Sequence, residues 1–287
     1  MDPLFLRTRV GSFEVNLLQD GFYRLDGGAM FGVVPKVVWE KRYPADELNR
    51  IRLGLDSLLV RAPGALVLIE AGIGSALGEK EIQMFAVEQP HPLPERLEAI
   101  GVKPEDIDHV VLTHLNFDHI GHCTRRLPGG TFVPTFPKAR YHVQKEEMDF
   151  ALAPPRRLRA SYPLDAIRPV EEAGLWVLHE GPAEVVPGIR LLPTGGHTPG
   201  HQVVLVESGG ETLVFWGDLV PTSRHLDPGY GMAYDLFPLR VLEQRGALVG
   251  RGADEGWIHT FPHEPEMHFL RVKRGKKYFE TEPIEPA

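Results

Sequence analysis

The sequence predicts a mixed α/β protein built from two halves, and three observations support this fold class. Short β-prone runs dominate the first 75 residues, and similar runs return from about residue 175. A segment with helical apolar spacing follows the strands of each half. With 43% hydrophobic and 24% charged residues, the 287-residue chain has the composition of an ordinary globular protein. We therefore expect one domain over residues 1–287.

The first half is expected to begin with antiparallel strands. A partly alternating run at 12–18 predicts a strand. The pairs Asp20-Gly21 and Asp26-Gly27, the latter followed by another glycine, predict turns after that strand. Two β-prone runs within 58–69 are separated by Pro63-Gly64, which is typical of a hairpin turn.

A helix, a strand and an irregular segment are expected next. Residues 92–100 have helical spacing and end at Gly101, which suits the position after a helix. The apolar run 109–113 predicts a buried strand. Residues 146–172 change in character, with prolines and arginines concentrated at 154–159. We expect this segment to be an excursion, part helix and part loop, over the cleft.

The second half repeats the order of strands followed by a helix. Ser208-Gly209-Gly210 predicts a hairpin turn between two of its strands. The predicted strands cover 189–192, 202–207, 212–216 and 257–261, and the predicted helix covers 239–248.

Charge and composition exclude several classes of partner. The net charge of −8 argues against a general affinity for nucleic acid. The longest strictly apolar run, at 65–69, is far below the roughly 20 residues that span a bilayer. The start of the chain lacks the features of a secretory signal, and the single cysteine excludes an internal disulfide. These features predict a soluble, cytoplasmic protein, and three asparagines beside 26 prolines favour a thermophilic source.

A polar stretch after the strand at 109–113 carries the first chemical signal. His114 and His119 flank Asp118 within Thr113-His114-Leu115-Asn116-Phe117-Asp118-His119. A strand that ends in polar residues places their side chains at a sheet edge, where they can converge on an ion. Neutral imidazole and carboxylate are ligands for zinc or iron.

Three more segments repeat this arrangement. His197 lies in a loop of glycine and proline after the strand at 189–192, Asp218 follows the run 212–216, and His263 follows the strand at 257–261. Each segment follows apolar residues and offers a metal-ligating side chain. Four such coincidences in this order are hard to explain as core histidines, so they predict a metal centre.

The order and spacing of these residues resemble the metallo-β-lactamase superfamily of metallohydrolases. Its hallmark is His-x-His-x-Asp-His followed by a later His, Asp and His. The contexts Phe117-Asp118-His119 and Gly196-His197-Thr198-Pro199-Gly200-His201-Gln202 are similar to the N-acyl homoserine lactonase branch. The resemblance implies a four-layer αββα sandwich with the metal site in the cleft where the loops of two packed sheets meet.

The resemblance also implies the ligands of two metal positions. One metal would be held by His114, residue 116 and His197, and the other by Asp118, His119 and His263. Asp218 would bridge them. The implied cofactor is Zn²⁺, one or two ions per chain, with Fe²⁺ as the alternative. Two cations about 3.5–4 Å apart lower the pKa of a shared water and stabilise a developing oxyanion.

Asn116 departs from the family pattern, which has histidine at this position. An amide oxygen binds zinc far more weakly than imidazole does. Three interpretations stay open. In the first, Asn116 is a weak ligand of a dinuclear centre with unequal metal positions. In the second, only one metal binds, at Asp118, His119, His263 and Asp218. In the third, one iron binds at His114, His197 and Asp218, as in the superfamily's persulfide dioxygenases.

Four further residues are weaker candidates. His201, four residues after His197, is expected to shape the loop or support a ligand rather than bind the metal. Tyr230 and Tyr234 are candidates for a phenol that contacts the substrate, because the position where lactonases carry their tyrosine is proline here. Cys123 is expected to be a small buried residue, with replacement of the missing ligand as the alternative. The seven remaining histidines without an evident partner are expected to be ordinary surface or core residues.

Three functions follow from this site. The first is a hydrolase that opens a lactone or carboxylic ester by attack of a metal-bound hydroxide, with Asp118 or water returning a proton to the leaving oxygen. The second is a mononuclear iron oxygenase acting on a sulfur compound. The third is a non-catalytic metal-binding protein whose centre has decayed at Asn116. The expected partners are a small-molecule substrate and, by symmetry, a second copy in a homodimer.

Overall fold

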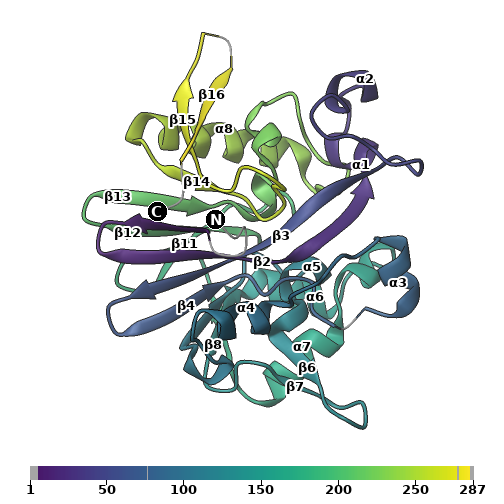
Figure 1. The fold of residues 1–287 in the computed structure, drawn as a ribbon, viewed down its shortest axis with the longest axis vertical. Helices are drawn as coiled ribbons and strands as arrows, with labels where there is room; N and C mark the ends of the chain where they lie inside the picture. The colour runs from purple at the N-terminus through teal and green to yellow at the C-terminus, as the bar shows by residue number, and fades with distance from the viewer. Residues whose placement is uncertain (1–5, 76, 277, 285–287) are drawn as a thin grey trace.

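Two seven-stranded sheets pack face to face, and helices cover the outer face of each sheet (Figure 1). The computed structural model describes residues 6–75, 77–276 and 278–284. Within these residues the layers follow the order helix, sheet, sheet, helix. The expected four-layer αββα sandwich is therefore confirmed.

The strands of each half of the chain form one sheet. In spatial order the first sheet contains β1 (Leu6–Val10), β2 (Phe13–Asp26), β3 (Arg50–Ala62), β4 (Ala65–Ile69), β5 (His109–Val111), β8 (Arg140–Gln144) and β9 (Trp176–His179). The second sheet contains β10 (Ala183–Val186), β11 (Ile189–Pro193), β12 (Gln202–Ser208), β13 (Glu211–Phe215), β14 (Ile258–Thr260), β15 (Leu270–Arg274) and β16 (Phe279–Pro283). A small separate hairpin pairs β6 (Thr124–Arg126) with β7 (Phe132–Pro134).

The helices connect and cover these strands. They are α1 (Gly27–Phe31), α2 (Lys36–Trp39), α3 (Glu79–Met84), α4 (Leu93–Ala99), α5 (Phe117–Ile120), α6 (Lys145–Leu152), α7 (Leu164–Glu172) and α8 (Pro238–Glu255). Helices α4, α6 and α7 pack on the first sheet, and α8 packs on the second. None of the helices in the described part of the chain combines the length and the apolar character needed to cross a membrane.

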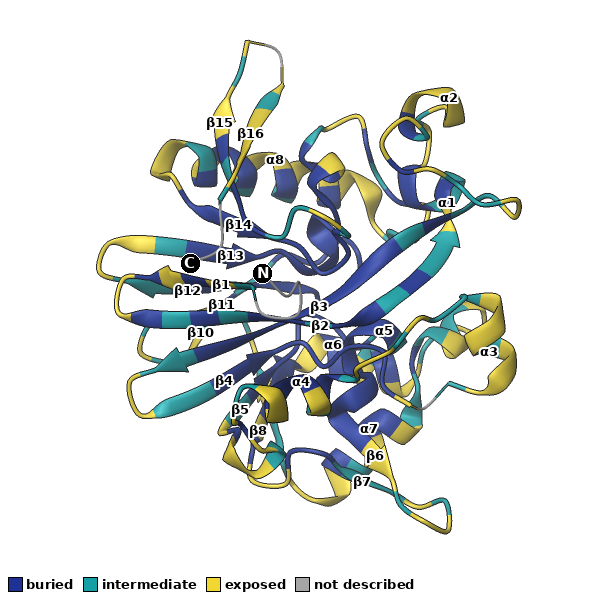
Figure 2. Ribbon diagram, viewed as in Figure 1, coloured by how far each residue is buried: buried dark blue, intermediate teal, exposed yellow. Residues whose placement is uncertain are grey.

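The inner faces of the two sheets form a shared apolar core. Alternate residues of β2 and β3, such as Val15, Leu17 and Val60, meet Val204 and Leu213 of the second sheet. Figure 2 shows the buried strands at the centre of the sandwich and the exposed residues at its helices and loops. Each fully buried aliphatic side chain contributes about 1.5–3 kcal/mol to folding, so this core fixes the relative position of the two sheets.

Two predicted hairpin turns and one predicted helix are confirmed. Pro63-Gly64 forms the hairpin turn between β3 and β4, where Gly64 adopts φ +78°. The helix predicted over 92–100 is α4, and Gly101 follows it with φ +72°. A left-handed backbone at these two positions favours glycine. The turn predicted at Ser208-Gly209-Gly210 connects β12 to β13.

The predicted turn at Asp20-Gly21 is wrong, because β2 continues through it. The register of β2 against β3 shifts between Gln19 and Phe22, so the pair forms a β-bulge. The bulge turns the buried Asp20 carboxylate toward the backbone N–H groups of Ile73 and Leu93, which donate to it at 2.9 and 2.6 Å. The second predicted turn is also wrong, since Asp26 caps α1 by accepting a hydrogen bond from the Ala29 N–H.

Three histidines that were expected to lack partners form a hydrogen-bonded row on neighbouring parallel strands. His109 Nδ1 lies 2.9 Å from His142 Nε2, and His142 Nδ1 lies 3.0 Å from His179 Nε2. Burial lowers the pKa of His142 to about 3, and the neighbouring histidines and Arg140 add to this effect. The row corrects the prediction for these residues, because each neutral ring can pair a donor with a neighbouring acceptor.

We expect this row to make the fold less stable in acid. An unfolded histidine has a pKa near 6.5, so below that pH the unfolded chain takes up a proton that His142 in the folded chain does not. Stability should therefore fall as the pH drops from about 6.5 toward 3. In urea unfolding between pH 7 and 4.5, the free energy of unfolding of His142→Gln should fall less with decreasing pH than that of the parent protein. The same pH dependence in both proteins would contradict this account. His91→Gln, at an exposed histidine, is the control.

Candidate metal centre

The candidate ligands lie in loops that follow the carboxyl ends of strands. Strand β5 is parallel to β4 and β8, and β13 is parallel to β14, so these ends meet at one edge of the sandwich. His114, Asp118 and His119 follow β5, and His197 follows β11. Asp218 and His263 follow β13 and β14. The fold therefore brings together residues that lie up to about 150 positions apart in the sequence.

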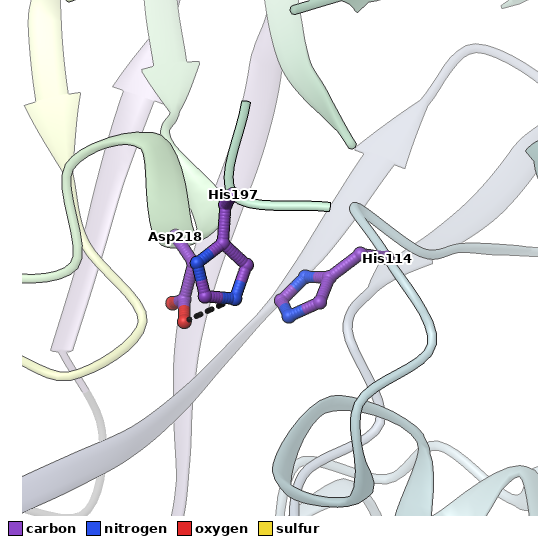
Figure 3. A group of neighbouring side chains, drawn as sticks. All are labelled: His114, His197 and Asp218. Atoms are coloured by element: carbon purple, nitrogen blue, oxygen red, sulfur yellow. Dashed lines mark ion pairs between the residues drawn. The ribbon is translucent and has the colours of Figure 1, made fainter. Parts of the chain in front are cut away.

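Two groups of side chains in the described residues are placed to hold a metal ion. His114, His197 and Asp218 form one group, and Asp118, His119 and His263 form the other; within each, the ligand atoms lie within 4.8 Å of one another. Figure 3 shows the first group, with the ring of His197 beside the Asp218 carboxylate and the ring of His114 on the other side of His197. All six side chains are buried.

Asp218 faces both groups. Its Oδ2 lies 3.3 Å from His197 Nε2 in the first group. Its Oδ1 lies 3.1 Å from His263 Nε2 and 3.5 Å from His119 Nε2 in the second. This position between the groups is the one that the resemblance implied for a bridging carboxylate.

Each histidine is oriented by an acceptor at its Nδ1 atom. The partners are Thr113 Oγ1 for His114 at 3.0 Å, Glu70 Oε2 for His119 at 2.8 Å, Asp235 Oδ1 for His197 at 3.0 Å and the Gly54 carbonyl for His263 at 2.9 Å. A ring that donates from Nδ1 presents the lone pair of Nε2. Such partners orient the histidine ligands of known metal sites.

The electrostatics of the site favour a cation. Burial disfavours the charged form of His119, but Asp118, Glu70 and Asp218 outweigh it and raise the pKa of His119 to about 10. Buried carboxylates otherwise cost several kcal/mol unless they are paired. The Nε2 atoms of His114 and His119 have no hydrogen-bond partner among the described residues. Buried lone pairs beside converging carboxylates fit one or two divalent cations.

Three supporting carboxylates were missed in the sequence. Glu70 directly follows β4 and has φ +67°, a backbone conformation that non-glycine residues rarely adopt. Glu147 accepts hydrogen bonds from the N–H groups of Leu115 and Gly200, so it ties the two histidine loops together. A charged residue at a strand end was a usable signal for Glu70. Glu147 and Asp235 carry no comparable local signal.

Tyr23 is the other residue that sequence reasoning missed. It lies within β2, and its hydroxyl donates to Asp118 Oδ2 at 2.6 Å and is 3.5 Å from His263 Nε2. Burial raises the pKa of Tyr23, and the neighbouring carboxylates of Asp118 and Asp218 raise it further. The phenol therefore keeps its proton and acts as a donor at the edge of the centre.

A cavity of about 540 Å³ opens above the candidate ligands. Its floor includes Asn116, Asp118, His197, Asp218 and His263. Its walls are mainly apolar and contain Leu25, Met30, Phe85, Phe117, Leu158, Met232 and Leu236. The segment between α6 and α7 contributes further residues to the lining, among them Arg157 and Tyr162. A cavity of this size accommodates a small organic molecule.

The weaker candidates from the sequence occupy different parts of the structure. Tyr234 lines the cavity, but Tyr230 packs edge-on against Phe31 in a buried cluster, so the prediction for Tyr230 is not supported. His201 Nδ1 pairs with Thr194 Oγ1 at 2.8 Å, and its ring lies 5.3 Å from that of His114. Cys123 is buried in the core between the first sheet and its helices and belongs to neither ligand group.

Metallohydrolases are found among the proteins similar to this chain both in sequence and in structure. A family model of the metallo-β-lactamase superfamily matches residues 52–258. A probable metallo-hydrolase of Mycobacterium tuberculosis is 27% identical, over 84% of this chain and 86% of its own length. An N-acyl homoserine lactonase of Bacillus cereus is 36% identical over a shorter stretch, 41% of this chain and 40% of its own.

Solved structures share the fold over the full chain. A dizinc quorum-quenching lactonase in complex with its product superposes with a TM-score of 0.78 at 23% identity, covering 100% of both chains. A probable metal-dependent hydrolase from Staphylococcus aureus superposes with a TM-score of 0.89 at 30% identity, covering 98% of this chain and 100% of the other. Because the family model matches most of the chain and the sandwich carries its ligand pattern, this protein belongs to the metallo-β-lactamase superfamily.

Proposed function

We propose that this protein is a metal-dependent hydrolase that opens a lactone or carboxylic ester. The observation that carries the proposal is the convergence of four imidazoles and two aspartates beside a cavity with mainly apolar walls. Four of these six side chains line the cavity: Asp118, His197, Asp218 and His263. His114, His197 and Asp218 would hold one cation, and Asp118, His119 and His263 the other. Divalent cations in these positions lower the pKa of a bound water and neutralise charge that develops on a substrate oxygen.

Asp118 is placed to transfer a proton, and Tyr23 is placed to position Asp118. Hydrolysis adds water across the carbonyl carbon–oxygen bond, and one proton of that water must reach the leaving oxygen. Asp118 faces the cavity and accepts a short hydrogen bond from the Tyr23 hydroxyl. In our proposal Asp118 passes the proton to the leaving oxygen, and Tyr23 holds the carboxylate in position for this transfer.

The lining of the cavity favours a substrate with an apolar substituent next to the carbonyl group. Phe85 and Phe117 stack in one wall, and Met232 and Leu236 lie in the lining as well. Arg157 is the only arginine or lysine among the described residues of the lining. Relatives named N-acyl homoserine lactonase support a lactone as the first substrate to test.

The presence of two ligand groups separates this proposal from its alternatives. A mononuclear iron oxygenase needs only His114, His197 and Asp218 as metal ligands, so the second ligand group would have no function in it. A decayed, non-catalytic centre does not account for an open cavity above six candidate ligands and their supporting partners. Zinc is the cation that we propose first, since imidazole and carboxylate suit it.

We expect the zinc-loaded protein to hydrolyse an aryl ester or a lactone with an alkyl substituent. Treatment with a chelator should abolish turnover, and added zinc should restore it. Asp118→Asn should lower kcat by about 10²–10⁴-fold, because proton transfer by a positioned side chain contributes this much. Turnover can be followed by titrating the acid that is released.

Asp149→Asn is the matched control for this experiment, since Asp149 is exposed on α6 and paired with Lys145. It should retain the parent rate. Failure of the zinc-loaded parent protein to hydrolyse any ester or lactone in such a panel would overturn the proposed function.

Tyr23→Phe should lower kcat by about tenfold or more without removing metal. A hydrogen bond to a charged group contributes about 1.5–3 kcal/mol, and this variant loses the bond that positions Asp118. Metal content per chain and the rate should be measured on the same sample. Tyr278→Phe, at an exposed tyrosine, is the control. A parental rate for Tyr23→Phe would show that the phenol is structural.

A further inference from the structure

The two ligand groups differ in one donor, Asn116, and this difference has a consequence for metal occupancy. We propose that Asn116 is a weak ligand of the His114–His197 position, so that this position fills only at a higher cation concentration than the other. The inference rests on the proposed function, because it makes the second cation a regulator of that hydrolase.

The side chain of Asn116 does not cap the helix that follows it. Asn116 is the first flanking residue of α5, where an asparagine side chain normally caps the helix. Here the side chain makes no capping hydrogen bond. Its Oδ1 instead lies 3.3 Å from His197 Nε2, and the residue lines the floor of the cavity.

Asn116 and Asp218 approach His197 at the same atom. Asn116 Oδ1 and Asp218 Oδ2 each lie 3.3 Å from His197 Nε2. His197 Nδ1 faces Asp235, so a neutral ring that donates from Nδ1 presents the lone pair of Nε2 to this position. A cation here would therefore meet an imidazole nitrogen, a carboxylate oxygen and an amide oxygen.

The chemistry of the donors makes the two positions unequal. Asp218 faces both groups, and each group contains two histidines. The remaining donor is the charged carboxylate of Asp118 in one group and the neutral amide of Asn116 in the other. A carboxylate attracts a divalent cation more strongly than an amide oxygen does, and an amide oxygen is a poor ligand for zinc.

The consequence is stepwise loading. At a low concentration of free cation the protein holds one ion, at Asp118, His119 and His263. The second ion enters as the concentration rises, and only then is the two-cation centre complete. Hydrolysis should follow the occupancy of the second position rather than the first.

Zinc binding to the chelator-treated full-length protein tests this inference without reference to turnover. Calorimetric titration with zinc, in competition with a chromophoric chelator for the tighter step, should resolve two unequal steps. Asn116→His should tighten the second step by about tenfold or more, because imidazole is the better zinc ligand. Asn116→Ala should weaken only that step, because it removes the amide oxygen from this position.

Two control variants separate a local effect from a general one. Asn16→His adds an imidazole on β2, where Asn16 pairs with Glu14, and Asn16→Ala removes an amide at the same place. Both should leave the two steps unchanged. Two steps of equal affinity in the parent protein would overturn the inference, as would parental binding by both Asn116→His and Asn116→Ala. Unequal steps in a protein that hydrolyses no ester or lactone would overturn the proposed function and leave the inference standing.

Discussion

The arrangement of the site depends on Asp218, which lies between two pairs of histidines. Its carboxylate is buried and faces His197 with one oxygen and His119 and His263 with the other. Burial alone would raise the pKa of Asp218, but the surrounding histidines outweigh burial and hold that pKa well below its usual range. A buried charge of this kind is stable only when cationic partners surround it, so the geometry of the histidines and the charge of Asp218 depend on each other.

The fold supplies that geometry through the ends of its strands. The two sheets are fixed face to face by their shared apolar core, and the loops after β5, β11, β13 and β14 meet at one edge. A second layer of side chains then sets the orientation of the rings. Glu70 holds His119, and Glu147 joins the loops of residues 113–119 and 195–201 through their backbone N–H groups. Rigid strands and a polar second layer together leave little freedom for the ligand atoms.

The candidate ligands could be predicted from the sequence because each lies in a polar segment that follows an apolar strand. This signal is local, and it identified His114, Asp118 and Asp218 without knowledge of the fold. Tyr23 could not be found in this way, because it lies inside a strand and reaches Asp118 only through packing across 95 positions of the chain. The bulge at Asp20-Gly21 was missed for a similar reason, since its cause is the buried carboxylate of Asp20 and the segments it holds.

The central claim is that six converging side chains hold two cations and that Asn116 faces one of them. A crystal structure of the zinc-loaded protein, with anomalous data collected on both sides of the zinc absorption edge, tests this claim most directly. We expect two anomalous peaks, one within each ligand group, with Asp218 between them and the Asn116 amide oxygen toward the weaker peak. A single peak, peaks elsewhere in the chain, or an Asn116 side chain turned away from the His114–His197 position would contradict the account.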